Sequence, residues 1–255
     1  MNSALHLDFT KIPLAHRALH DVAAGRPENS RAAIRAAMAA GYGIEIDVQA
    51  SADAQAMVFH DDTLPRLSHG EGRISVFSAA ELAAVQLRGG DEGIPTLAEV
   101  LEIVAGRVPL LIEVKDQDGA MGPNVGPLED AVALALRHYK GPVAVMSFNP
   151  HSVRHLAQVA PDIARGLVTC AFDPAGEDVP PERCAELRQI SNFDELGCSF
   201  ISHDRADLDA DRVRELKDAG AHILCWTVKS AQQEAEARKI AENITFEQYL
   251  PAISA

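Results

Sequence analysis

Two short segments of the chain alternate carboxylates with apolar side chains. The first reads Gly-Ile-Glu-Ile-Asp-Val from residue 43, and the second reads Leu-Ile-Glu-Val-Lys from residue 111. Alternate residues of a β-strand share a face, so Glu45 and Asp47 lie on one side of the first segment, and Glu113 and Lys115 on one side of the second. Carboxylates that face a buried interior repel one another unless a cation lies between them, and oxygen ligands suit Mg²⁺ or Ca²⁺ better than zinc. The alternative for either segment alone is an edge strand with solvated charges.

Two histidines follow apolar runs and have charged neighbours. His16 precedes Arg17, and His60 precedes Asp61. A neutral imidazole can accept a proton while a second, protonated imidazole donates one, which is what cleavage of a P–O bond requires. The planar guanidinium of Arg17 and the compact ammonium of Lys115 are suited to phosphate oxygens. Most of the other histidines are interpreted as structural or exposed.

The elements that must position these residues follow an alternating pattern. Strands are expected at Ile12–Arg17, Ile44–Val48, Pro109–Lys115, Val143–Phe148, Arg165–Cys170, Ser199–His203, His222–Val228 and Asn243–Phe246. Helices are expected at Ser30–Ala40, Thr96–Val104, Leu128–Tyr139, Ser152–Val159, Asp211–Ala219 and Ala231–Ile240. This alternation predicts parallel strands covered by helices, and eight strands favour a closed (β/α)₈ TIM barrel over an open sheet. The catalytic groups of such barrels lie at the carboxyl ends of the strands.

One stretch interrupts the alternation. Met57–His60 is a short additional apolar segment after the second strand, and the chain from 61 to about 95 is glycine-rich, with helical periodicity only around Ser78–Leu87. We interpret residues 61–95 as a small insertion over one face of the barrel. Because linkers, low-complexity tracts and repeats are absent elsewhere, residues 1–255 are expected to form a single domain.

Composition limits the class of protein. The chain has 23 Lys and Arg against 37 Asp and Glu, a formal net charge of −14, which excludes a general nucleic-acid binder and a polybasic membrane-surface protein. No apolar run reaches the ~18 residues of a membrane span, and we see no signal peptide. The four cysteines form no C-x-x-C pair, and three lie in strand-like apolar runs. A cytoplasmic location with reduced cysteines is therefore expected.

A set of short motifs falls in a fixed order along the chain. It comprises His16-Arg17-Ala18, Pro27-Glu28-Asn29-Ser30, Ile44-Glu45-Ile46-Asp47-Val48, His60-Asp61, Ile94-Pro95-Thr96-Leu97, Ile112-Glu113-Val114-Lys115, Ser147-Phe148 and Cys225-Trp226-Thr227-Val228. Each motif is weak alone, but the ordered set, from about Ile12 to Val228, resembles the glycerophosphodiester phosphodiesterase family.

The resemblance implies a fold, a reaction and a set of roles. It implies a (β/α)₈ barrel that hydrolyses a glycerophosphodiester to sn-glycerol 3-phosphate and an alcohol. The implied roles are a divalent cation, Mg²⁺ or Ca²⁺, on Glu45, Asp47 and Glu113; His16 and His60 as the acid–base pair; Arg17 and Lys115 on the phosphate; and Trp226 beside the substrate. The insertion lies where that family carries a small cap. Trp226 is equally compatible with the barrel core, and Ser30 with a helix cap.

The chain departs from the family pattern at three places. Ala18 stands where the family usually has glycine, and Ser51-Ala52-Asp53-Ala54 replaces a Thr/Ser-x-Asp-Gly turn. The last strand commonly reads Ile-Ile-Thr-Asp-x-Pro, whereas this chain reads Asn-Ile-Thr-Phe-Glu-Gln-Tyr-Leu-Pro from residue 243. The altered strand leaves the alcohol specificity open rather than the chemistry.

Several alternatives remain open at this stage. Two other functions are possible: a phospholipase D-like lyase that acts on lysophospholipids, and a non-catalytic phosphodiester-binding barrel. The sequence also leaves open whether water or the glycerol 2-hydroxyl is the nucleophile and which histidine is the acid. The oligomeric state is open as well. The acidic side chains interpreted as solvated charges are Asp194, Glu195, Asp204 and Glu247.

Overall fold

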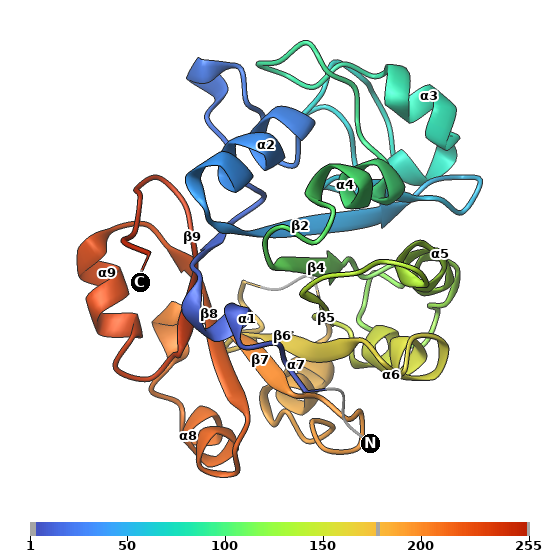
Figure 1. Cartoon of the computed structure of the whole chain (residues 1–255). Coiled ribbons are helices and arrows are strands. Elements are labelled where there is room, and N and C mark those ends of the chain that lie inside the picture. The colour runs from blue at the N-terminus through green and yellow to red at the C-terminus, as the bar shows by residue number, and fades with distance from the viewer. Residues whose placement is uncertain (1–3, 177–178, 254–255) are drawn as a thin grey trace.

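Eight parallel strands close into a barrel in the computed structural model, which describes residues 4–176 and 179–253. They are β1 (Leu14–Ala15), β2 (Gly43–Ala50), β4 (Leu110–Val114), β5 (Val143–Ser147), β6 (Ala164–Thr169), β7 (Phe200–Asp204), β8 (His222–Val228) and β9 (Asn243–Phe246). Each strand pairs with the next in this order, and β1 closes the ring by pairing with both β2 and β9. The predicted TIM barrel is confirmed, and every predicted strand is present (Figure 1).

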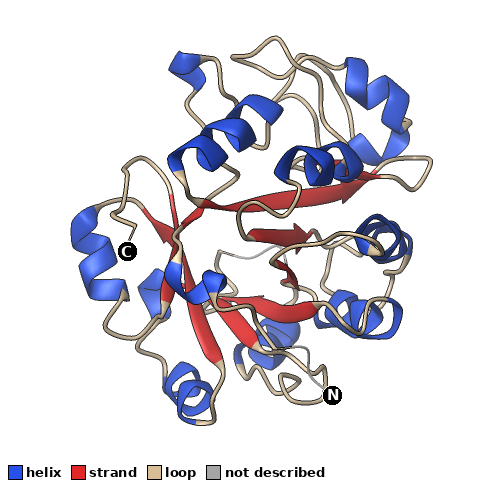
Figure 2. Cartoon of the chain, in the orientation of Figure 1, coloured by secondary structure: helices blue, strands red, loops and turns tan. Residues whose placement is uncertain are grey.

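Helices cover the outside of the barrel (Figure 2). The six predicted helices are α2 (Arg31–Ala40), α4 (Leu97–Val104), α5 (Pro127–Leu136), α6 (Pro150–Val159), α8 (Asp211–Asp218) and α9 (Ala231–Ala237). The predicted ends of α5 and α9 were three residues too late. Two further helices, α1 (Asp8–Lys11) and α7 (Pro181–Arg188), were not predicted. The helix α7 is mostly polar and exposed, so its sequence carries little apolar periodicity.

The additional apolar segment forms β3 (Ala56–Val58), which pairs antiparallel with β2. After it, residues 59–95 contain α3 (Ala79–Ala84) and a 3₁₀ turn at Ile74–Val76. Strand β3 and residues 59–95 pack together around a small apolar cluster of Met57, Phe59, Leu64, Ile74, Leu82, Leu87 and Ile94. This segment lies beside α2 and α4 at the top right of Figure 1.

The barrel interior is apolar at its amino-terminal end. Leu5 and Phe9, from the chain before β1, are buried with inward-facing side chains of the strands such as Leu111 and Phe200. Gly166 on β6 leaves room for that packing, because a Cβ there would lie 2.5 Å from the ring of Phe200. Asn243, at the start of β9, is a buried polar side chain at this end and donates to Phe9 O and Ile12 O. The charged side chains that line the candidate site lie at the opposite, carboxyl-terminal end.

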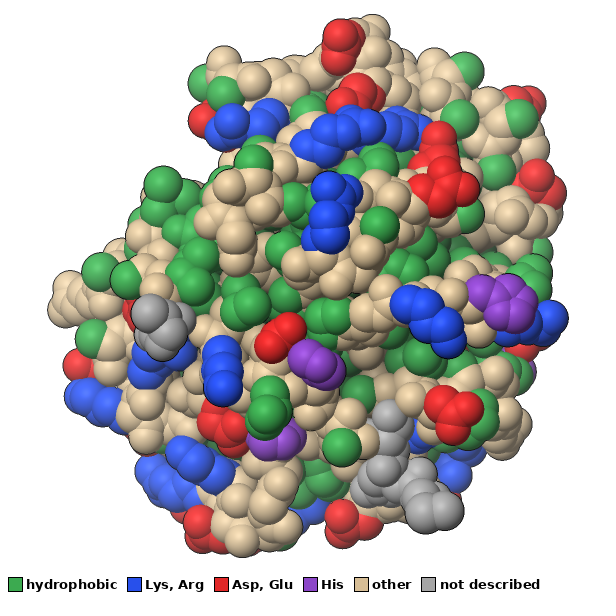
Figure 3. Space-filling view, viewed as in Figure 1, with side chains coloured by type: hydrophobic (Ala, Val, Ile, Leu, Met, Phe, Trp, Pro, Cys, Tyr) green, Lys and Arg blue, Asp and Glu red, His purple; other side chains and the backbone are tan. Residues whose placement is uncertain are grey.

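The surface is charged and mixed in sign. On the face that Figure 3 shows, acidic and basic side chains are interspersed among apolar and neutral ones. In the part of the chain that the structure describes, none of the helices has the length and apolar character needed to cross a membrane.

Candidate active site

A cavity of 270 Å³ opens among the carboxyl ends of the strands. Each of the eight residues singled out from the sequence lines it: His16, Arg17, Glu45, Asp47, His60, Glu113, Lys115 and Trp226. The other lining residues are Met146, Phe148, Val168, Ser202, Thr227 and Thr245. Residues up to 229 positions apart in the sequence (16 and 245) therefore meet in one place, because parallel strands bring their carboxyl ends to the same edge.

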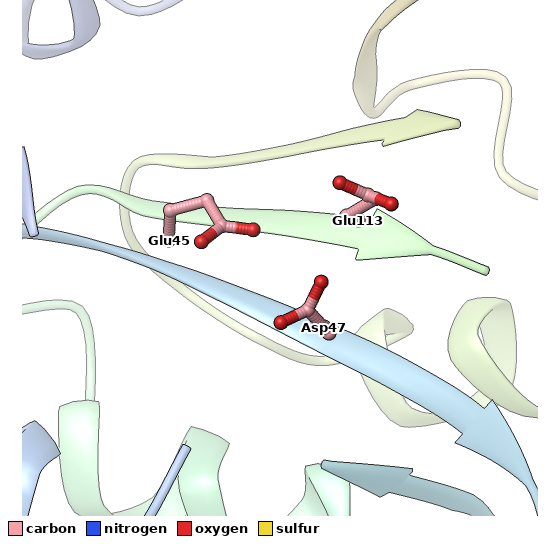
Figure 4. A group of neighbouring side chains, drawn as sticks. All are labelled: Glu45, Asp47 and Glu113. Atoms are coloured by element: carbon pink, nitrogen blue, oxygen red, sulfur yellow. The ribbon is translucent and has the colours of Figure 1, made fainter. Parts of the chain in front are cut away.

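Three carboxylates converge in this cavity (Figure 4). One oxygen from each of Glu45, Asp47 and Glu113 lies within 4.8 Å of the others, and all three residues are buried. Asp47 on β2 is the register partner of Glu113 on β4, which places their side chains next to each other. Burial, together with the charges of Asp47 and Glu113, raises the pKa of Glu45 well above its usual value. A divalent cation would relieve this repulsion, so the three oxygen donors fit a Mg²⁺ or Ca²⁺ site.

Lys115 supplies part of the compensating charge. Its Nζ lies 2.7 Å from Asp47 Oδ1 and 2.5 Å from Glu113 Oε1. Burial alone would lower the pKa of this ammonium, but the two carboxylates raise it. For Asp47 burial acts in the other direction and would raise the pKa, but Lys115, His60 and Arg17 together hold it well below its usual range. Asp47 and Lys115 are therefore both charged at neutral pH.

Arg17 is held beside the carboxylates by an unusual turn of the backbone. Arg17 and Ala18 both have left-handed φ angles, 52° and 65°. This turn aims the backbone N–H of Arg17 at Glu45 Oε2, at 2.9 Å, and its guanidinium donates to Glu28 Oε1 at 2.8 Å. The Arg17 Nε is also 3.8 Å from Asp47 Oδ2. A glycine at position 18 would adopt this φ without steric cost, which gives a physical reason for the glycine that Ala18 replaces.

His60 is held by the carboxylate of Asp61, which is in turn held by the guanidinium of Arg66. Its Nδ1 lies 2.7 Å from Asp61 Oδ1, and Arg66 donates to Asp61 from Nε and Nη2 at 2.6 Å each. Burial would raise the pKa of Asp61, but the hydrogen bonds from Arg66 and His60 lower it well below its usual range. Arg66 also contacts Glu28, the partner of Arg17, so residues that follow β1 and β3 are joined with the insertion in one chain of charged contacts.

His16 is held in the same way by a residue that was misjudged from the sequence. Its Nδ1 lies 2.8 Å from Glu247 Oε2. The interpretation of Glu247 as a solvated charge was wrong: its side chain is only 12% exposed, and the hydrogen bond from His16, together with the nearby His20 and Lys229, lowers its pKa far below the usual value. Burial lowers the pKa of His16 itself, so this imidazole is neutral at pH 7. By contrast, Asp194 and Glu195 are exposed, as expected.

Aromatic side chains form one wall of the cavity. The rings of Phe148 and Trp226 meet edge to face with centroids 5.6 Å apart, and Phe148 meets Phe172 at 6.2 Å. Trp226 is half-buried, and its indole N–H donates to Ser202 O at 3.0 Å. The pairing of β8 with β9 shifts register between Cys225 and Val228, and this irregularity brings the consecutive residues 226 and 227 both to the cavity.

Two supporting residues were not identified from the sequence. Asn29 is buried and donates from Nδ2 to Asp47 Oδ2 at 2.9 Å, while Arg66 joins Glu28 to Asp61. Ser30 is the N-cap of α2, because its Oγ accepts from the backbone N–H of Ala33. The sequence signal for Asn29 was its position in the motif Pro27-Glu28-Asn29-Ser30. That motif could also be explained by capping of the following helix, so Asn29 was not recognised as a contact of the site.

Comparison with known proteins gives consistent matches. A model of the glycerophosphoryl diester phosphodiesterase family matches residues 16–243. The glycerophosphodiester phosphodiesterase of Caldanaerobacter subterraneus subsp. tengcongensis is 34% identical over 56% of this chain and 61% of its own length. The bovine (Bos taurus) glycerophosphodiester phosphodiesterase 1 is 34% identical over 87% of this chain and 73% of its own length. The structure of an Oleispira antarctica phosphodiesterase with its product sn-glycerol-3-phosphate superposes with a TM-score of 0.76 at 25% identity, covering 93% of this chain and 94% of that one.

Proposed function

The chain belongs to the glycerophosphoryl diester phosphodiesterase family of phosphoric diester hydrolases, and we propose that it hydrolyses glycerophosphodiesters to sn-glycerol 3-phosphate and an alcohol. The observation that carries the proposal is the convergence of two carboxylate-bound imidazoles, two cationic side chains and three buried carboxylates on one cavity. The partner is a small molecule. The product bound to the Oleispira antarctica phosphodiesterase supports glycerol 3-phosphate as one half of the substrate.

We propose that Glu45, Asp47 and Glu113 hold a divalent cation, Mg²⁺ or Ca²⁺. Their surplus of buried negative charge over Lys115 supports this assignment. A cation bound there supplies charge neutralisation for the phosphate and for the transition state. The guanidinium of Arg17, which lies beside these carboxylates, would bind and orient phosphate oxygens, with Lys115 as a further positive charge.

The two histidines are proposed as the general acid and the general base. Each has its Nδ1 on a carboxylate, which leaves Nε2 as the atom that exchanges a proton with the substrate. One imidazole would take the proton of the attacking oxygen, and the other would protonate the leaving alkoxide. Trp226 and Phe148 would limit the access of water and contact the substrate. Residues 61–95 would act as a cap, tied to the site through Arg66.

The decisive experiment is steady-state hydrolysis of glycerophosphocholine by His16→Ala and His60→Ala. Each variant is expected to lose activity by about 10²–10⁴-fold, the usual contribution of a positioned acid or base. The matched control is His138→Ala, because His138 is exposed and lies outside the cavity. If either site variant kept near-wild-type activity, that histidine would not be the acid or the base.

The identity of the product tests the reaction class. Phosphorus NMR is expected to show sn-glycerol 3-phosphate from glycerophosphocholine. A cyclic phosphate from a lysophospholipid as the final product would point instead to a lyase. Binding without turnover in the presence of Mg²⁺ and Ca²⁺ would point to a phosphodiester-binding barrel without catalysis.

A further inference from the structure

The carboxylate of Glu247 contacts two different sets of partners through its two oxygens. Oε2 lies 2.8 Å from His16 Nδ1 and 3.6 Å from His20 Nε2. Oε1 lies 2.7 Å from Lys229 Nζ and accepts from the side-chain amide of Gln248 at 3.3 Å. One oxygen is therefore anchored by a cation, and the other is presented to the imidazole.

The backbone fixes this arrangement at the point where β9 ends. The N–H of Glu247 donates to Val228 O at 3.0 Å, and the N–H of His16 donates to Phe246 O at 2.9 Å. Gln248, the next residue, has a left-handed φ of 67°, which marks a turn of the chain directly after Glu247. Glu247 is thus locked between β8 and β1 with its side chain aimed at His16.

We propose that Glu247 is the positioning residue for His16. It accepts a hydrogen bond from the protonated Nδ1 and thereby directs the free Nε2 of the imidazole to the substrate. Among the described residues, nothing donates a hydrogen bond to Nε2 of His16 or accepts one from it. A carboxylate on Nδ1 selects the tautomer with the proton on that atom, because only a protonated nitrogen can donate to it. The inference rests on the proposed catalytic role of His16.

The His60 side of the cavity supports this assignment. Asp61 contacts Nδ1 of His60 at 2.7 Å and is anchored by Arg66, just as Glu247 contacts Nδ1 of His16 and is anchored by Lys229. Asp61 adjoins its histidine in sequence, whereas Glu247 is 231 positions from His16. Two imidazoles held alike, each by a cation-anchored carboxylate, face one cavity.

Kinetics of Glu247 variants test the proposal. In Glu247→Leu, kcat for glycerophosphocholine is expected to fall about 10- to 100-fold with KM within twofold, because partners that orient a reacting imidazole have effects of this size. Glu247→Gln keeps an acceptor oxygen for Nδ1–H and should recover part of the lost kcat. A merely structural role would predict no such recovery and no separation of kcat from KM.

The chain offers a matched control at the opposite end of the same two strands. Glu242 Oε2 lies 2.6 Å from His222 Nδ1, so this pair has the same chemistry and also joins the starts of β8 and β9. Glu242→Gln is expected to leave kcat and KM unchanged. Thermal denaturation of each variant by circular dichroism verifies that it is folded.

Nitrogen-15 NMR of histidine-labelled, metal-free protein reads the tautomer without reference to activity. The His16 signals, assigned by their loss in His16→Gln, are expected to show a protonated Nδ1 and a free Nε2 in the wild type, and a mixture in Glu247→Leu. If Glu247→Leu does not fold, Glu247→Ala, which also lacks an acceptor for Nδ1–H, takes its place in both measurements. Wild-type kcat in the Glu247 variants, or a wild-type His16 with its proton on Nε2, would overturn the proposal. Full activity of His16→Ala would instead overturn the proposed function.

Discussion

The ammonium of Lys115 lies 2.7 Å from a carboxylate oxygen of Asp47, which is one of the three carboxylates proposed to bind a cation. Glu113 accepts from the same ammonium, so one positive charge serves two of the three buried carboxylates. The cavity therefore has a counterion of its own for two of the acids. The third acid, Glu45, has no such partner, and burial and its two acidic neighbours raise its pKa, which disfavours its charged form. Stability and cation binding should be coupled through this lysine.

Replacing Lys115 by methionine should expose that coupling. Removing one partner of a buried ion pair leaves an uncompensated charge, and in EDTA we expect the free energy of unfolding to fall by about 3–5 kcal/mol. A divalent cation should then raise the melting temperature more than it does in the wild type. Lys239→Met is the control, because Lys239 is an exposed residue paired with Glu236. Equal responses of both variants to Mg²⁺ and to Ca²⁺ would contradict the prediction.

Cation binding should itself stabilise the wild-type fold. At a cation concentration 100-fold above Kd, linkage predicts a gain of about 2.7 kcal/mol, which EDTA should reverse. Asp47→Asn should lose most of the shift, since it removes the charge of one of the three converging carboxylates. The control is Glu215→Gln on α8, where the carboxylate is exposed. Differential scanning calorimetry with Mg²⁺, with Ca²⁺ and with EDTA makes the measurement, and a shift retained in Asp47→Asn would place the cation elsewhere.

Arg66 should matter more than its exposure suggests. Its side chain is half exposed, yet it donates twice to Asp61 and reaches Glu28, the partner of Arg17. Arg66→Met should release Asp61 and lower kcat about tenfold, at the lower end of effects for partners that orient a reacting imidazole. Arg73→Met is the control within the same insertion, because Arg73 pairs with Asp62 and both side chains are exposed. Kinetics on glycerophosphocholine decide the matter, and equal activities of the two variants would count against a role for Arg66.

The barrel was predictable because its signals are local. Apolar runs mark the strands, and β8 and β9 have the predicted bounds. The placement of Glu45 and Asp47 on one face follows from alternation within a single strand and needs no knowledge of distant residues. Helix α7 was missed because few of its residues are buried, so packing left little periodicity in its sequence.

The supporting residues were not predictable because their partners are distant in sequence. Glu247 is identified by its contact with His16, which exists only once β9 and β1 are neighbours. A lone glutamate near the end of the chain is solvated far more often than buried. The role of Arg66 is likewise visible only in the folded barrel, where the insertion lies against Glu28. Local pattern thus predicts the elements and their inward faces, whereas the carboxylates and cations that orient the imidazoles depend on barrel closure.

The cysteines should be inert in the folded protein. Cys170, Cys184, Cys198 and Cys225 are all buried thiols, and burial raises the pKa of Cys198 and of Cys225 to about 12. Because the thiolate is the reactive form, a colorimetric disulfide reagent at pH 8 should modify fewer than one thiol per chain within an hour. In denaturant it should modify four. Rapid modification of the native protein would show that the segments around these residues open readily.

The stability of the fold should decline as the pH falls below neutral, and a buried histidine is one cause. His203 is 1% exposed; its Nδ1 lies 2.8 Å from Thr169 Oγ1, and its Nε2 lies 3.3 Å from Asp207 Oδ2. Burial lowers its pKa from the ordinary 6.5 even though Asp207 acts in the opposite direction. The unfolded chain therefore binds a proton at this residue at a pH where the native protein does not. The stabilising contribution is complete above pH 6.5 and is lost as the pH falls towards the native pKa.

Urea unfolding in EDTA between pH 7.5 and pH 5.5 measures this contribution. One proton taken up on unfolding changes the free energy by about 1.4 kcal/mol per pH unit, and His203 should supply up to that slope below pH 6.5. His203→Gln keeps a polar side chain that does not titrate, so it should lower stability at pH 7.5 but show a shallower decline with falling pH. His16 and His151, whose pKa values burial also lowers, are unchanged in the variant, so the difference in slope belongs to His203. Parallel curves for the two proteins would mean that His203 is protonated equally in the native and unfolded states.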